Sequence, residues 1–106
     1  MDKVSVLIVD DSALMRNLIG RIVESSEGLE IASKAMNGEF ALQKIPKVNP
    51  DIILLDLEMP QMNGIEFLKE RKRRGIDIPV VILSSLAKKG AQITMEALSL
   101  GASDLY

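Results

Sequence analysis

The stretch VLIVDDSALMR, residues 6–16, changes abruptly from apolar to acidic. Its apolar run is rich in β-branched residues and nearly continuous, which is typical of a strand that is covered on both faces of a sheet. The run ends in two adjacent carboxylates, Asp10 and Asp11. Adjacent carboxylates repel each other, and burying either one is costly unless a partner compensates its charge. The stretch therefore predicts a buried strand that ends in a functional concentration of negative charge.

Apolar strands alternate with amphipathic helices along the rest of the chain. Strands are expected over residues 4–9, 29–35, 51–56 and 78–83, with the start of a fifth at 104–106. Helices are expected between Ser12 and Gly28, from the Asn37-Gly38 turn through Ile45, over 64–74 and over 91–100. Pro46 should end or kink the second helix, because its ring would clash with the carbonyl group of Leu42. This alternation predicts an α/β domain with a parallel sheet and right-handed crossovers, with its ligand site at the carboxyl ends of the strands.

Composition narrows the functional classes. The chain has 106 residues, of which 47% are hydrophobic and 26% charged, which suits one globular domain. A net charge of −2 gives no reason to expect nucleic acid or an anionic membrane as a partner. The chain has no cysteine and no histidine, so a metal site must use oxygen ligands, which favours a hard cation such as Mg²⁺. No secretory leader or membrane-length apolar run is evident, and the cytoplasm is the default location.

Side chains suited to metal binding and catalysis lie at the ends of the expected strands. Asp10 and Asp11 follow the first strand, Asp56 ends the third, and Ser84 follows the fourth. If these strands are parallel neighbours, three carboxylates and a hydroxyl group converge on one edge of the sheet. A divalent cation would relieve the repulsion, and a carboxylate beside it can act as a nucleophile toward phosphorus. Ser84 would then donate a hydrogen bond to a phosphoryl oxygen.

The residues at these positions resemble the receiver domain of two-component response regulators. Within that family they most resemble the N-terminal receivers of chemotaxis protein-glutamate methylesterases. The motifs that carry the resemblance are VDDSALMR (9–16), DLEMPQMNG (56–64), ILSSL (82–86) and GASDLY (101–106). The resemblance implies a flavodoxin-like, doubly wound fold with a parallel five-stranded sheet of order 2-1-3-4-5. It also implies that residues 1–106 form one receiver domain, which stops short at its C-terminal end.

The resemblance assigns roles to individual residues. Asp56 corresponds to the phosphoacceptor. Asp11 corresponds to the direct ligand of Mg²⁺, Asp10 to an acid that acts on the ion through water, and the backbone carbonyl group of Glu58 to a third protein ligand. Ser84 lies where the family has its switching serine or threonine.

The resemblance also implies a signalling role. A chemotaxis-type histidine kinase would supply the phosphoryl group, and the output would be a methylesterase domain that acts on chemoreceptors and lies outside this chain. No separate catalytic site is expected within the 106 residues, and neither nucleic acid nor a membrane is expected as a partner.

Two positions depart from the family pattern. The family has a lysine shortly after the fifth strand, and this chain reaches Tyr106 about two residues before that position, so the lysine and the final helix are missing. Leu105 occupies the place of the family's switch aromatic, with Tyr106 one position later. We therefore expect a readout that depends less on a rotating ring than on the loop after Ser84 and the helix that follows it.

Two other functions remain open at this point. One is a receiver-fold binding module, alone or in a larger protein, that is never phosphorylated; it would be expected to lack an acid or the hydroxyl group. The other is a phosphatase with an aspartate nucleophile, although such enzymes place both acids on one strand end.

Structural roles are the simpler alternatives for the same residues. Asp10 and Asp11 would then cap the first helix, Asp56 would be an ordinary loop acid, and Ser84 would satisfy backbone groups after its strand. The basic stretch KERKRR, residues 69–74, is interpreted as cations that complement a helix C-terminus rather than as a nucleic-acid patch.

Overall fold

The computed structural model describes residues 3–56, 63–82 and 104–105. Its elements in chain order are β1 (Val4–Val9), α1 (Ala13–Ser25), β2 (Leu29–Ala35), α2 (Gly38–Val48), β3 (Ile52–Leu55), α3 (Gly64–Arg73), β4 (Val80–Ile82) and β5 (Asp104–Leu105). The strands form one sheet in the order β2-β1-β3-β4-β5, and all neighbours are parallel. This confirms the predicted doubly wound α/β fold and its strand order. The expected helix over 91–100 lies outside the described residues.

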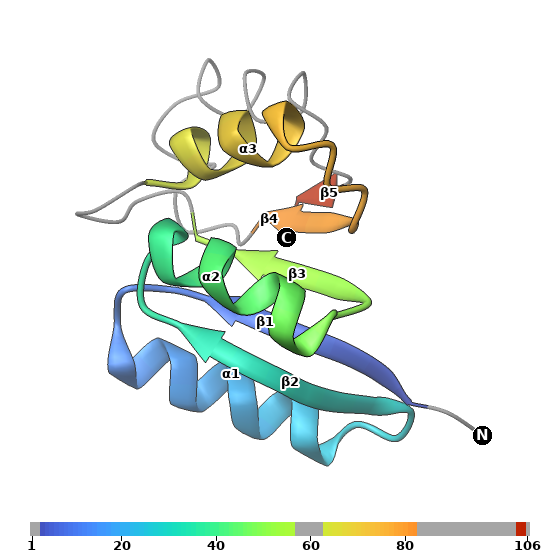
Figure 1. Cartoon of the computed structure of the whole chain (residues 1–106). Coiled ribbons are helices and arrows are strands. Elements are labelled where there is room, and N and C mark those ends of the chain that lie inside the picture. Colours follow the sequence, from blue (N-terminus) through green and yellow to red (C-terminus); the bar gives the residue numbers. More distant parts are fainter. Residues whose placement is uncertain (1–2, 57–62, 83–103, 106) are drawn as a thin grey trace.

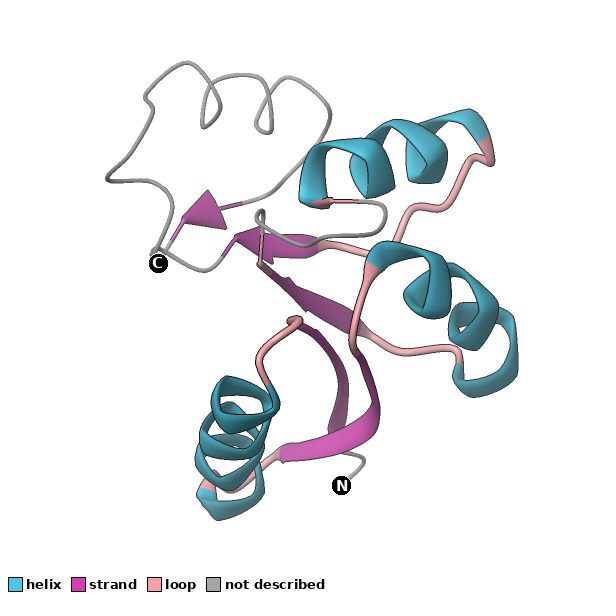
Figure 2. Ribbon diagram, turned by 90° about the vertical axis from the view of Figure 1, so that its left-hand side faces the viewer, coloured by secondary structure: helices cyan, strands magenta, loops and turns pink. Residues whose placement is uncertain are grey.

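The sheet separates two helical layers. Figures 1 and 2 show α1 on one face and α2 with α3 on the other. Successive side chains of β1 therefore enter different cores: Leu7 and Val9 pack in the cluster under α2 and α3, whereas Val6 and Ile8 pack in the cluster under α1. All four are buried, which explains why the β1 sequence is apolar at consecutive positions.

Side-chain caps fix where each helix begins. The Ser12 hydroxyl accepts a hydrogen bond from the Met15 N–H (3.2 Å), and the Asn37 side chain accepts one from the Phe40 N–H (2.9 Å). Asn63 forms a capping box with Glu66 at the start of α3. These caps satisfy backbone donors that a helix N-terminus leaves unpaired. They also place the starts of α1 and α2 within a few residues of the carboxyl ends of β1 and β2.

The prediction that the second helix extends only through Ile45 is wrong. α2 continues through Pro46 to Val48, and Asn49 caps it in the left-handed conformation (φ 46°), with its N–H donating to the carbonyl oxygen of Ile45 (2.8 Å). Proline in the last turn removes only one hydrogen bond, the one that its N–H would have donated to Leu42. The cap closes the helix beyond it.

Two strands begin later in the chain than predicted. β3 begins at Ile52, and the Asp51 carboxylate just before it accepts hydrogen bonds from the N–H (2.8 Å) and the hydroxyl group (3.2 Å) of Ser5. The carbonyl oxygen of Ile78 accepts from the Arg71 guanidinium, and β4 begins at Val80. In the described part of the chain, no helix is long and apolar enough to cross a membrane.

Arg71 is buried although it belongs to the basic stretch at the end of α3. Its Nε and Nη2 atoms donate to the Ile78 carbonyl oxygen at 3.2 and 2.8 Å. Burial lowers the pKa of Arg71, and the charge of Asp77 partly opposes that effect. By contrast, Arg73 and Arg74 bind Glu70 on the surface and lower the pKa of that carboxyl group to about 2. Arg71 thus ties α3 to the segment that leads into β4.

We predict that Arg71→Met lowers the free energy of unfolding by about 1.5–3 kcal/mol, the usual value of hydrogen bonds made by a charged group. Urea unfolding followed by circular dichroism would measure the change. Lys72→Met, at the exposed neighbouring position, is the matched control and should change stability by no more than about 0.5 kcal/mol. Equal losses in the two variants would contradict a bridging role for Arg71.

Candidate functional site

The register of β1 and β3 brings two aspartates to the same edge of the sheet. Val9 pairs with Leu55, and Asp10 and Asp56 are the residues that follow them. The Asp56 N–H donates to the carbonyl oxygen of Val9 (2.9 Å), so the backbone of Asp56 is fixed directly beside β1. The position of both carboxylates is therefore set by strand pairing rather than by a free loop.

Asp10, Asp11 and Asp56 form one acidic cluster. Each offers a carboxylate oxygen, and these oxygens all lie within 4.8 Å of one another. Asp10 and Asp56 are buried, with exposed fractions of 5% and 8%, whereas Asp11 is exposed. The structure thus brings together the three acids that the sequence placed at strand ends. The other two predicted site residues, Glu58 and Ser84, lie outside the described residues.

The surroundings of Asp10 shift its pKa in both directions. Burial is the main factor that raises the pKa of Asp10, and the charge of Asp11 raises it further. The N–H of Ser12 opposes this by donating to Oδ1 of Asp10 (2.9 Å), as does the nearby positive charge of Arg16. The net shift is upward, and burial is its largest cause.

The donor set fits Mg²⁺. All three ligating groups are carboxylates, the ligands that hard cations prefer. Two oxygens bound to one Mg²⁺ are at most about 4.2 Å apart, so closing the cluster on an ion requires only small side-chain movements. Asp11 is exposed and can make such a movement.

Sequence reasoning did not single out Arg16. Its Nη1 atom donates to the backbone carbonyl oxygen of Asp10 (2.6 Å) and so holds the turn that carries the acid pair. The signal available in the sequence was its place one helical turn after the Ser12 cap. A basic side chain there can reach back over the helix N-terminus.

Comparison with known proteins assigns the family. Residues 6–105 match the response regulator receiver domain, and the chain belongs to this family. It is 68% identical over 104 residues to a protein-glutamate methylesterase/protein-glutamine glutaminase of Treponema denticola and 50% identical to one of Clostridium acetobutylicum. Each match covers 98% of this chain but only 28% and 30% of the respective relative, so the chain spans less than a third of their length.

Two solved structures support the same assignment. The response regulator domain of Thermotoga maritima CheB superposes with a TM-score of 0.90 at 40% identity, covering 98% of this chain and 77% of that one. The receiver domain of a putative NarL response regulator from Mycobacterium tuberculosis superposes with a TM-score of 0.89 at 30% identity, over 99% and 83%. The chain is therefore a receiver domain of the chemotaxis CheB-like type.

We predict that Asp10→Asn raises the melting temperature of the metal-free chain by a few degrees at neutral pH. The amide oxygen can still accept the Ser12 N–H, while the repulsion and the cost of burying a charge are removed. The sign follows from the raised pKa: the folded chain binds the Asp10 proton more tightly, so its stability falls as pH rises from about 4 through that pKa.

Thermal unfolding with a chelator present, across this pH range, would measure both effects. Asp77→Asn, at an exposed position after α3, is the control for removing one negative charge. A lower melting temperature for Asp10→Asn would mean that the carboxylate acts as a structural cap.

Proposed function

We propose that this chain is a phosphorylation-controlled switch in which Asp56 accepts a phosphoryl group from a histidine kinase. The observation that carries the proposal is the convergence of buried Asp56 with Asp10 and Asp11 at the carboxyl ends of two paired strands. Membership of the receiver family supports it. A binding module that is never phosphorylated would not need to retain this repulsive cluster.

In the proposed reaction, a carboxylate oxygen of Asp56 attacks the phosphorus atom of a phosphohistidine. The new P–O bond gives an acyl phosphate as the P–N bond breaks, and the released imidazole takes a proton from solvent. Bound Mg²⁺ would neutralise negative charge on the transferred phosphoryl group. The hydrogen bond from the Asp56 N–H to the carbonyl oxygen of Val9 fixes the backbone of the nucleophile beside β1, which limits where its carboxylate can lie.

The acids are assigned different tasks at the metal. Oδ1 of Asp10 already accepts the Ser12 N–H, which leaves its other oxygen to hold a metal-bound water. Asp11 is exposed and is assigned as the direct ligand, together with Asp56 and the backbone carbonyl group of Glu58. The Glu58 assignment rests on the family resemblance alone.

The output is proposed to be a methylesterase domain of the parent protein that acts on chemoreceptors in the cytoplasm. The methylesterase activity is proposed from the names of relatives that are more than three times as long as this chain. The chemoreceptor substrate and the cytoplasmic location are proposed from the family resemblance. Ser84 is assigned as the trigger, because a hydroxyl group there would donate a charge-assisted hydrogen bond to the phosphorylated aspartate. The kinase partner would be of the chemotaxis type.

Binding of Mg²⁺ should depend more on Asp11 than on Asp10. We predict that Asp11→Asn weakens binding roughly tenfold or more, and that Asp10→Asn, which removes only a water-mediated contact, weakens it less. Titration with MgCl₂ followed by NMR would give both dissociation constants, with Asp77→Asn as the surface control. Equal losses at the two positions would refute the division of tasks.

Asp56→Asn should abolish phosphorylation. The test uses the full-length protein, incubated with acetyl phosphate and Mg²⁺. Intact-mass spectrometry should find one phosphoryl adduct in the wild type and in Asp77→Asn, and none in Asp56→Asn. An adduct that persists in Asp56→Asn would eliminate Asp56 as the acceptor, and rapid release of free phosphate without an adduct would indicate a phosphatase.

A further inference from the structure

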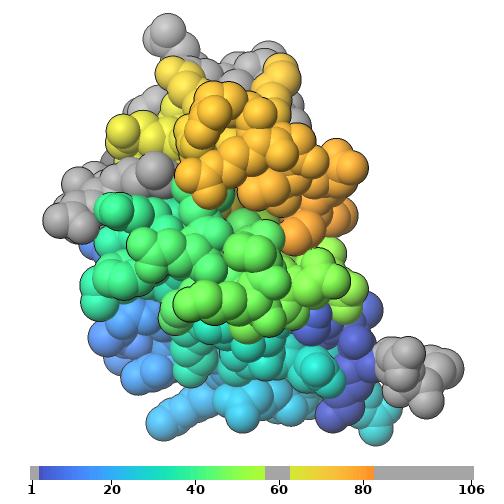
Figure 3. All heavy atoms as spheres, in the orientation of Figure 1, coloured from blue at the N-terminus to red at the C-terminus, as the bar shows by residue number. Residues whose placement is uncertain are grey.

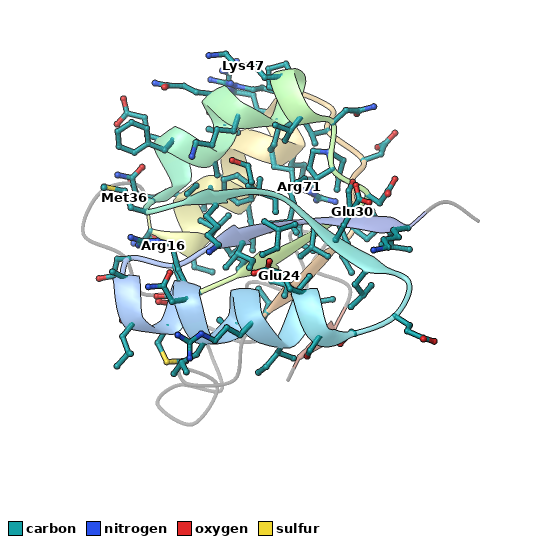
Figure 4. All side chains as sticks on the ribbon, turned by 90° about the horizontal axis from the view of Figure 1, so that it is seen from below. Arg16, Glu24, Glu30, Met36, Lys47 and Arg71 are labelled. Carbon is teal, nitrogen blue, oxygen red and sulfur yellow. The ribbon has the colours of Figure 1, made fainter. Side chains whose placement is uncertain are left out.

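A second site candidate lies at the outer edge of the sheet. A groove of about 260 Å³ is lined by Arg16 of α1, Lys34 of β2, Met36 after β2, and Phe40 and Lys44 of α2. It crosses the end of β2, which is the edge strand next to β1. Figure 4 shows Arg16 and Met36 together at this end of the molecule, and Figure 3 shows the outer surface of α2 between α3 and the β2 layer. We call these five residues the edge groove.

The edge groove carries three positively charged side chains, those of Arg16, Lys34 and Lys44. Arg16 donates to the carbonyl oxygen of Asp10, and Lys44 donates to that of Lys34. The end of the Lys34 side chain lies over α1 at Gly20, where an added Cβ would be 3.1 Å from both Cε and Nζ. The hydrogen bonds of Arg16 and Lys44 are to uncharged carbonyl groups, and all three cations are half-buried.

Two exposed apolar side chains complete the groove. Met36 and Phe40 have exposed fractions of 51% and 43% and flank the buried cap residue Asn37. Apolar surface of this kind gains free energy when a partner covers it. A ligand that matches the whole groove must therefore offer both negative charge and an apolar group.

The hydrogen bond from Lys44 limits how a partner can bind. An open edge strand is normally a template for adding another strand. Lys44 occupies the carbonyl oxygen of Lys34 on this edge. Recognition through side chains is therefore favoured over strand addition. An acidic peptide segment fits better than a small anion, which would leave Met36 and Phe40 uncovered.

We propose that the edge groove docks an acidic segment of a protein partner. An apolar side chain of the segment would cover Met36 and Phe40, and its carboxylates would face Arg16, Lys34 and Lys44. This interaction needs neither a phosphoryl group nor Mg²⁺. Its failure can thus be distinguished from failure of the proposed switch.

The test measures fluorescence polarisation of a labelled glutamate-rich peptide that contains one leucine, mixed with the full chain in a chelating buffer. The peptide should bind saturably and more weakly at higher salt. Lys34→Gln/Lys44→Gln should weaken binding roughly three- to thirtyfold, the range expected for two partly exposed ion pairs. Lys3→Gln/Lys72→Gln makes the same charge change at exposed positions outside the groove and should bind like the wild type.

Further probes separate the alternative occupants. Met36→Gln should weaken binding without changing its salt dependence, and a peptide with glutamine in place of every glutamate should not bind. Circular dichroism would establish that each variant is folded. No saturable binding, or equal losses in the two double variants, would overturn the proposal. So would competition by inorganic phosphate alone, or binding to anionic lipid vesicles in place of the peptide.

Discussion

The repulsion among Asp10, Asp11 and Asp56 is the constraint around which the rest of the structure is arranged. Two of these carboxylates are buried, and desolvation of a charged group costs several kcal/mol. The residues that precede them, Val9 and Leu55, are fully buried neighbours in adjacent strands. Each such side chain contributes about 1.5–3 kcal/mol, and the core contains many of them. The core is therefore strong enough to hold the acids at a spacing that they would not adopt alone.

The turn after β1 relieves part of this repulsion without neutralising it. Ser12 both caps α1 and donates its own N–H to the Asp10 carboxylate. The first turn of α1 carries no acidic residue, so the positive end of the helix faces the cluster with little competition. Two backbone features thus stabilise the Asp10 carboxylate without placing a cation on it.

Much of the fold and the acidic cluster could be predicted from the sequence because both depend on local patterns. Unbroken β-branched runs identify buried strands, and residues that follow parallel strands meet at one edge. The strand order came from the family resemblance. Local patterns could not predict the burial of Arg71 or the continuation of α2 through Pro46. Arg71 looks like its neighbours in a basic stretch, and its burial depends on the Ile78 carbonyl oxygen; Pro46 was tolerated because Asn49 caps the helix beyond it.

Arg16 lines the edge groove and also contacts the turn that carries the acidic cluster. A salt bridge from Arg16 to the Asp10 carboxylate would compensate the cluster and compete with a metal ion for the same oxygen. The guanidinium instead donates to the backbone carbonyl oxygen of Asp10. This bond fixes the turn, and the Ser12 N–H occupies only one oxygen of the carboxylate. The positive charge of Arg16 therefore acts in two directions: it lowers the pKa of Asp10, and it lines the edge groove beside Lys34 and Lys44.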